Sequence, residues 1–264
     1  PMIPVSGTPM STQAMITWPK HEKAVVITRG EVLGDRTDFT PYAPGTDSEM
    51  MVIDEITQGQ ASTCSLARDQ VDPDLPMTIA PCDSGALYDP ASFEQQLSSG
   101  ADVLIWGMRG HPRAAQHPEQ YGWIAESNGL VTAISTKVPL DDPKSDPIII
   151  GTFTFKKASD YFSAADHMYE RDGRINGEFY VDECINDAIE LGLKCVVFEI
   201  DHYLSWGTPD ELDTFHYWQS CFHKWASHPY RLERDPLVAT ENVGELETRY
   251  SPIHPKRPQD RQVG

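Results

Sequence analysis

Positive charge is scarce in this sequence. Its 264 residues carry 21 Lys and Arg against 40 Asp and Glu, which gives a formal net charge of −19 at pH 7. A chain this acidic repels the phosphate backbone of nucleic acids and the anionic surface of membranes, so neither is expected as a partner. If the protein handles phosphates, it should need a metal cation to neutralise them.

Cysteine pairs and long apolar runs are missing as well. The five cysteines are scattered and form no C-x-x-C motif, which argues against a zinc site or a disulfide framework and favours reduced thiols. We find no run of 18 apolar residues, no signal peptide and no internal repeat. These absences predict a cytoplasmic protein.

Apolar residues make up 39% of the chain, enough for the core of one large α/β domain or two smaller ones. Short β-branched segments alternate with longer segments of helical character, which predicts a mixed sheet covered by helices. The expected strands are 23–28, 50–54, 76–80, 102–106, 148–155 and 194–200, and the expected helices are 92–98, 158–171, 181–191 and 209–224.

The end of the chain has a different composition. Residues 231–264 hold four prolines and mixed charges with little apolar periodicity. We expect them to form an extended tail that follows a domain of residues 1–230.

An acidic residue follows the short apolar strand of residues 76–85 (P-M-T-I-A-P-C-D-S-G). The apolar run stops at Pro81, so Asp83 lies just past the strand's C-terminal end, which is the edge where open α/β sheets bind ligands. A carboxylate there suits a hard divalent cation that bridges phosphate oxygens. The alternative is that Asp83 only caps a turn.

Residues 57–68 (T-Q-G-Q-A-S-T-C-S-L-A-R) carry a glycine turn followed by small residues that begin a helix. Such a turn lets the backbone approach a planar or anionic ligand and points free N–H groups at it. An ordinary capped helix after a loop explains these residues equally well.

Several segments resemble, in order and spacing, the nucleotidyltransferases that activate sugar phosphates and capsule-precursor phosphates. The resemblance covers roughly residues 1 to 222. The matching segments are 1–10 (P-M-I-P-V-S-G-T-P-M), the helix start in 57–68, the strand that ends in Cys82-Asp83, the hairpin 121–137, the apolar strand 147–155, the segment 176–187 (N-G-E-F-Y-V-D-E-C-I-N-D) and the W-G-T-P element in 203–212.

The resemblance implies a Rossmann-like nucleotidyltransferase fold of the GT-A type, with a mixed, mostly parallel central sheet flanked by helices. It implies that a phosphate or phosphonate oxygen of an acceptor attacks the α-phosphorus of a nucleoside triphosphate and releases pyrophosphate. Such an enzyme mainly aligns two polyanions and neutralises their charge. The implied partners are a nucleoside triphosphate, a phosphorylated small molecule and Mg²⁺.

The resemblance also implies roles for individual residues. Asp83 would hold Mg²⁺, and Asp201 is a candidate second ligand because Ser205 stands where many relatives carry an aspartate. Lys137 would contact the acceptor phosphate, although a solvated hairpin lysine is the commoner case. The base would be read by Gln58, Gly59, Ala61, Ser62 and Thr63, and the acceptor would be bound by Gly122, Lys137, Gly151 and Glu178.

Two alternatives stay open. The family's first strand and Gly-rich phosphate loop precede the P-M-I-P-V segment at the start of this sequence. Without them we expect the nucleotide to be held through its base, as in a catalytically silent binding or assembly subunit. A GT-A glycosyltransferase that uses a sugar nucleotide is disfavoured, because Ser84-Gly85 and not a D-x-D pair accompanies Asp83. The sequence leaves the base, the acceptor and a homo-oligomeric state open.

Overall fold

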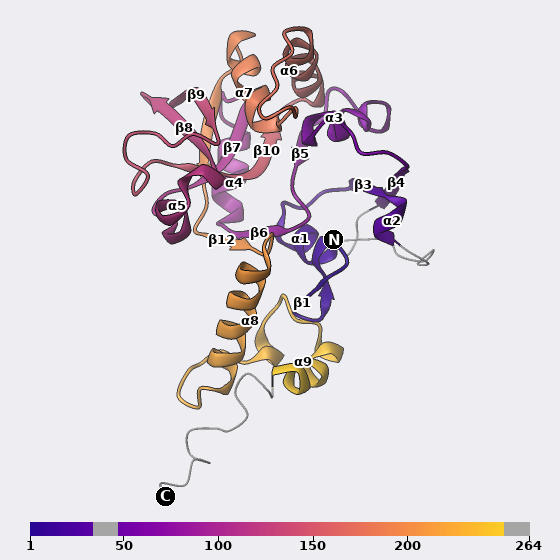
Figure 1. The fold of residues 1–264 in the computed structure, drawn as a ribbon, viewed down its shortest axis with the longest axis vertical. Helices are drawn as coiled ribbons and strands as arrows, with labels where there is room; N and C mark the ends of the chain where they lie inside the picture. The colour runs from indigo at the N-terminus through magenta and orange to yellow at the C-terminus, as the bar shows by residue number, and fades with distance from the viewer. Residues whose placement is uncertain (34–46, 251–264) are drawn as a thin grey trace, which may run out of the picture.

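The computed structural model describes residues 1–33 and 47–250 and confirms the mixed α/β fold. Its largest sheet has six strands in the order β11, β7, β10, β8, β9, with β5 beside the second half of β10 (Figure 1). Within this sheet β7 pairs in parallel with β11, and all other pairings are antiparallel. β5, β7, β8 and β11 therefore point one way, and β9 and β10 point the other way. The bounds are β5 Met77–Ile79, β7 Val103–Met108, β8 Gly122–Ser127, β9 Leu130–Thr136, β10 Ile148–Phe155 and β11 Cys195–Glu199.

Strand β10 joins the two halves of this sheet. Its sequence, I-I-I-G-T-F-T-F, is buried along nearly its whole length, as expected of a central strand. The register with β7 shifts between Ile149 and Phe153, and Gly151 lies inside that shift with a φ of +80°. Glycine adopts this conformation without strain. β10 accordingly pairs with β8 at Ile148 and with β5 from Phe153 onward.

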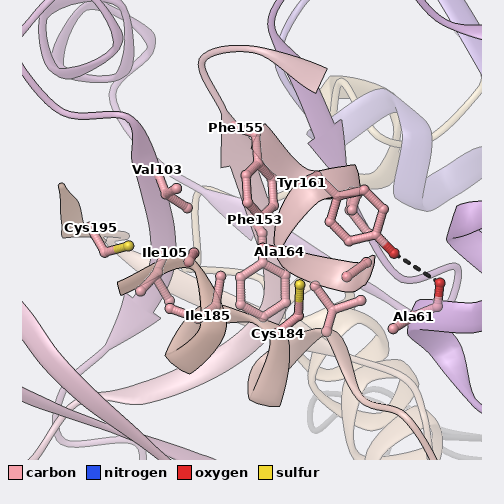
Figure 2. Close-up of a cluster of buried hydrophobic side chains, with 14 of the residues drawn as sticks. Ala61, Val103, Ile105, Phe153, Phe155, Tyr161, Ala164, Cys184, Ile185 and Cys195 are labelled. Atoms are coloured by element: carbon pink, nitrogen blue, oxygen red, sulfur yellow. Dashed lines mark hydrogen bonds between the residues drawn. The ribbon is translucent and has the colours of Figure 1, made fainter. Parts of the chain in front are cut away.

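Helices α6 (Ala158–Glu170) and α7 (Val181–Glu190) pack on one face of the sheet. Figure 2 shows Phe153 of β10, Ile105 of β7 and Ile185 of α7 within this core. Each of these side chains is at most 1% exposed, so each contributes about 1.5–3 kcal/mol through burial of apolar surface.

Helix α4 (Pro90–Leu97) belongs to a second apolar cluster. Its Phe93 ring lies 5.4 Å from that of Trp106 and 5.5 Å from that of Phe198. Trp106 alternates along β7 with Ile105, which faces the first cluster, so α4 covers the opposite face of the sheet.

Three strand pairs of the described residues lie outside the six-stranded sheet, and the first is the antiparallel hairpin of β1 (Pro4–Val5) and β2 (Thr8–Pro9). β3 (Lys23–Arg29) and β4 (Asp47–Ile53) pair in parallel, and β6 (Ser84–Leu87) pairs antiparallel with β12 (His202–Ser205). The sequence predicted β3 and β4 but neither β6 nor β12, because a four-residue strand carries little periodicity. The β6–β12 pair carries the segment after Asp83 alongside the segment before W-G-T-P.

The prediction of an extended tail is wrong over residues 231–250. This segment holds two 3₁₀ turns and helix α9 (Val243–Tyr250), which Figure 1 shows beside α8 (Pro209–Lys224). The hydroxyl of Tyr250 donates to Gln219 of α8. Gln219 in turn donates to the hydroxyl of Ser6 at 2.9 Å, so the tail, α8 and the first hairpin are tied together. The rest of the expected tail, 251–264, lies outside the described residues.

The remaining elements are short. No helix of residues 1–33 and 47–250 is long and apolar enough to cross a membrane. The bounds are β1 Pro4–Val5, β2 Thr8–Pro9, α1 Met10–Thr17, α2 Gly30–Leu33, α3 Gln60–Ser65, α5 Pro112–Gln116, and the 3₁₀ turns η1 Arg68–Gln70, η2 Pro118–Gln120, η3 Leu232–Arg234 and η4 Thr240–Asn242.

Asp187 of α7 is a fully buried carboxylate that holds α7 to the end of α6. It accepts hydrogen bonds from Arg171 Nε and Nη2, both at 2.7 Å, and from His167 Nδ1 at 2.8 Å. The exposed carboxylate of Glu190 lies 3.9 Å from the same His167 nitrogen. His167, Asp187 and Glu190 are close enough to hold a metal ion, but Arg171 already supplies the positive charge that Asp187 needs.

We expect Asp187→Asn to lower the free energy of unfolding by about 2–3 kcal/mol, because it weakens two charge-assisted bonds and leaves Arg171 partly uncompensated. Urea unfolding measures the loss. Glu190→Gln is the matched control, and it should change stability by less than about 0.5 kcal/mol because Glu190 is exposed. Equal losses for both variants would show that Asp187 is not the anchor of this network.

Candidate functional site

Asp83 lies where β5 leads into β6, next to the segment that follows β12. The backbone carbonyl of Asp83 accepts a hydrogen bond from Trp206 N at 2.9 Å. A Cβ atom at Gly207 would lie only 2.9 Å from Asp83 Oδ2. The pairing of Ser84 with Ser205 thus brings the W-G-T-P element against the carboxylate, and a side chain at 207 would require the Asp83 carboxylate to move.

The Asp83 carboxyl is partly removed from water. Burial, and to a smaller extent the nearby charge of Glu211, raises its pKa above the usual range. A cation would offset the cost of burying this charge. Because Mg²⁺ can use one or two protein carboxylates and complete its coordination with substrate phosphates and water, the donor at Asp83 fits such an ion.

The second expected ligand, Asp201, is not brought to this place. β12 runs antiparallel to β6, with Ser205 opposite Ser84 and His202 opposite Leu87. The N–H of Asp201 donates to the carbonyl of Leu87 at 2.9 Å, so Asp201 lies at the other end of the ladder from Asp83. Four residues of extended strand span about 13 Å. The pairing of Asp83 with Asp201 around one ion is therefore wrong.

Glu211 is the carboxylate near Asp83 that the sequence analysis missed. It is the third residue of α8, and its Oε2 accepts from Thr208 N at 3.1 Å and from Thr208 Oγ1 at 2.9 Å. Its Oε1 lies 3.5 Å from Arg113 Nε of α5. Both oxygens have partners, so Glu211 caps α8 and pairs with Arg113. The sequence T-P-D-E, a capping box, is the signal that predicts this role.

Lys137 ends the hairpin of β8 and β9 in the left-handed region, with a φ of +63°. Its Nζ donates to the carbonyl of Gln120 at 2.6 Å and lies 6.0 Å from the centre of the Tyr180 ring. On the neighbouring strand, a Cβ atom at Gly122 would lie 2.3 Å from Oδ2 of Asp182. The structure thus brings two expected acceptor residues, Gly122 and Lys137, to the start of α7.

Asp182 is a second residue that the sequence analysis missed. Burial raises its pKa to about 6, and the charge of Lys137 opposes this rise. The carboxyl therefore forms an electrostatic pair with the one lysine assigned to the acceptor. Its position in the D-E-C-I-N-D run, in the first turn of a helix, gave no sign that it would be buried against a glycine of another strand.

The two other expected acceptor residues, Glu178 and Gly151, have different surroundings. Glu178 is exposed and closes a tight turn, in which it exchanges backbone hydrogen bonds of 2.9 and 3.0 Å with Ile175. At Gly151, a Cβ atom would lie 3.4 Å from the ring of Pro81. Gly151 therefore faces the segment that carries Asp83 and not the Lys137 hairpin.

The expected base-reading turn is held against Phe179 by its backbone. Phe179 N donates to the carbonyl of Gln58 at 2.8 Å, and Ala61 N donates to the carbonyl of Phe179 at 3.0 Å. Gly59 has a φ of +125°, and a Cβ atom there would lie 2.5 Å from the Phe179 oxygen. Glycine is required at 59 for both reasons.

This contact changes the expected role of the start of α3. The N–H of Ala61 is used by Phe179, and the N–H of Thr63 donates to the carbonyl of Gly59 at 3.1 Å. The Thr63 hydroxyl lies 2.6 Å from that of Thr57. The expectation that this helix start points free N–H groups at a ligand therefore fails at Ala61 and Thr63. Gln58 offers an exposed polar side chain at this turn.

Comparison with known proteins identifies the fold. No protein-family model and no curated protein sequence matches this chain. Solved structures do match. A nucleoside-diphosphate-sugar pyrophosphorylase from Vibrio cholerae superposes with a TM-score of 0.63 at 18% identity, over 81% of this chain and 89% of the other. The inositol-1-phosphate CTP transferase of T. maritima gives 0.59 at 12% identity, over 81% and 83%.

A protein from Bacillus anthracis described as a glucose-1-phosphate thymidylyltransferase gives a TM-score of 0.56 at 21% identity, over 81% of this chain and 83% of its own. All three are similar to this chain in fold over 81% of its length. This chain has the fold of these nucleotidyltransferases.

Proposed function

We propose that this protein is a metal-dependent nucleotidyltransferase. It would couple a nucleoside triphosphate to a sugar phosphate or a similar phosphorylated capsule or polysaccharide precursor and release pyrophosphate. The observation that carries the proposal is the partly buried Asp83 carboxylate at the edge of a sheet of this fold, pressed against Gly207. Mg²⁺ is the proposed cofactor, and the cytoplasm, where thiols stay reduced, is the proposed compartment.

The proposed chemistry asks little covalent work of the protein. The acceptor phosphate is already an anion, so the residues align the two substrates and neutralise charge without a general base. Asp83 would hold Mg²⁺, which supplies charge neutralisation on the triphosphate when bound. Lys137 would bind the acceptor phosphate, with Gly122 and Glu178 beside it, while Gln58 contacts the base.

The neighbourhood of Lys137 refines its proposed role. The Gln120 carbonyl, which accepts from Lys137 Nζ at 2.6 Å, and the charge of the nearby Asp182 carboxyl would orient the lysine ammonium group before any acceptor arrives. A fixed ammonium group loses less side-chain entropy when it binds an anion, because its rotamer is already selected. Asp182 would therefore act through Lys137 and not on the reacting atoms.

A catalytically silent nucleotide-binding subunit is the second candidate. At the start of α3, the N–H groups of Ala61 and Thr63 are already bonded within the protein. These groups are therefore not free to hold phosphate oxygens. The two candidates differ in turnover and agree on nucleotide binding.

Asp83→Asn should abolish Mg²⁺-dependent pyrophosphate release and keep the fold, because the amide has the shape of the carboxylate without its charge. Pyrophosphate release from each nucleoside triphosphate with glucose 1-phosphate as acceptor, and the melting temperature, measure the two effects. Asp201→Asn is the matched control and should keep its activity, since Asp201 lies at the far end of the ladder. Turnover near the wild-type rate in Asp83→Asn would remove the proposed metal ligand.

Lys137→Ala should weaken binding of the acceptor more than binding of the nucleotide, by about 1.5–3 kcal/mol if the ammonium group makes a charge-assisted bond to phosphate. Separate calorimetric titrations with glucose 1-phosphate and with nucleoside triphosphates measure the two affinities. Lys144→Ala, which removes an exposed lysine of the 141–147 turn, should change neither. Equal losses for both ligands would place Lys137 outside the acceptor site.

Asp182→Asn should stabilise the protein at pH 8 and leave its stability unchanged near pH 3. The folded protein holds the Asp182 proton with a pKa of about 6 against an ordinary 3.8, so wild-type stability falls as the pH rises through this interval. Melting temperatures against pH test the sign. Asp142→Asn should show the opposite sign at pH 8, because hydrogen bonds from Ser145 and Lys144 lower the Asp142 pKa. A pH-independent effect of Asp182→Asn would contradict the assignment.

A further inference from the structure

Arg174 lies between the turn assigned to the base and the segment assigned to the acceptor. Its Nη2 donates to the side-chain oxygen of Gln58, and its Nη1 donates to the carbonyl of Gly177 at 3.2 Å. Gly177 directly precedes Glu178. One guanidinium group therefore contacts both segments.

The guanidinium group is itself fixed. Its Nε donates to Asp172 at 2.6 Å, and its Cζ lies 4.1 Å from the centre of the Phe179 ring. Phe179 is 4% exposed and packs against Tyr169, with ring centres 4.8 Å apart. Arg174 thus has two hydrogen-bonding partners besides Gln58 and packs on a buried aromatic ring. These contacts restrict the orientation of the guanidinium group that donates to Gln58.

This contact decides which end of the Gln58 amide faces outward. Arginine has only donors, so the group that meets it must be the carbonyl oxygen of the amide. The NH₂ group of Gln58 then points away from Arg174. The oxygen and nitrogen of an amide are assigned from such hydrogen bonds, and here the assignment has one solution because Arg174 cannot accept.

We propose that Arg174 is a positioning residue that fixes the Gln58 amide with its NH₂ group toward the base. The base site then selects a hydrogen-bond acceptor, a carbonyl oxygen or a ring nitrogen, at the edge that Gln58 reads, and it disfavours an amino group there. This inference rests on the proposed function, because that proposal assigns Gln58 to the base.

The test compares substitutions at the two positions by calorimetric titration with ATP, GTP, CTP, UTP and dTTP in Mg²⁺. Gln58→Ala should weaken binding of the best-bound nucleotide about tenfold, because it removes one hydrogen bond to the base; this factor corresponds to about 1.4 kcal/mol. Gln58→Glu should weaken it at least as much, because an acceptor replaces the donor while the bond from Arg174 remains. If the amide oxygen read a base amino group instead, Gln58→Glu would bind as well as the wild type, and the proposal would be overturned.

Arg174→Met tests the positioning role, since methionine can keep the packing on Phe179 and has no donor. We expect a loss of about five- to tenfold in the wild-type background and no further loss in the Gln58→Ala background. Arg174→Lys should recover part of the affinity because it restores one donor. Additive losses would show that Arg174 acts elsewhere and would overturn the inference.

Two controls separate this inference from a folding defect and from the proposed function. Arg68→Met removes another arginine that lies over an aromatic ring, Phe162, and pairs with Asp166, and it should leave nucleotide binding unchanged. Hydrogen exchange at the amides of Ala61 and Phe179 should stay slow in Arg174→Lys if the fold is kept. If the wild type binds none of the five nucleotides, the proposed function fails and the inference with it. If the wild type binds but Gln58→Ala has no effect, only the inference fails.

Discussion

The register shift in β10 is the constraint on which the arrangement of the candidate site depends. Because the strand bulges at Gly151, its first half pairs with β8 and its second half with β5 on the same side. β8 carries Gly122 and leads to Lys137, and β5 leads to Asp83. Both segments are therefore anchored on a single buried strand.

Burial and scarce positive charge together set the electrostatics of the site. Burial raises the pKa of both Asp83 and Asp182, and Lys137 partly offsets the effect only at Asp182. The arginines nearby are already used, since Arg113 pairs with Glu211 and Arg174 with Asp172. In a chain with a net charge of −19, these pairs are the reason why we propose a metal ion as the source of the positive charge that the two proposed phosphorylated substrates would need.

Close backbone contact joins the two proposed substrate segments. The turn at Gly59 lies directly on Phe179, which no side chain at 59 would permit. The same contact uses the N–H of Ala61, the second residue of α3, and leaves the exposed amide of Gln58 as the group proposed to discriminate a base. Arg174 then orients that amide from the acceptor side, so recognition of the base and the shape of the acceptor segment share one set of hydrogen bonds.

The sequence by itself determined four strands of the sheet, β5, β7, β10 and β11, and the helices α4, α6, α7 and α8, because apolar periodicity is a local signal. The hairpin of β8 and β9 was expected only from the family resemblance. The sequence also placed Asp83 beyond a strand end, and the resemblance placed Lys137 at a hairpin end. Only the tertiary structure decided which of these groups meet. Asp201 is separated from Asp83 by the register of β6 and β12, two strands too short to show periodicity. The carboxyl of Asp182 lies against Gly122 of another strand, and Ala61 is bonded by a residue far along the chain. Such contacts depend on how separate elements pack, and the residues of either partner alone do not encode them.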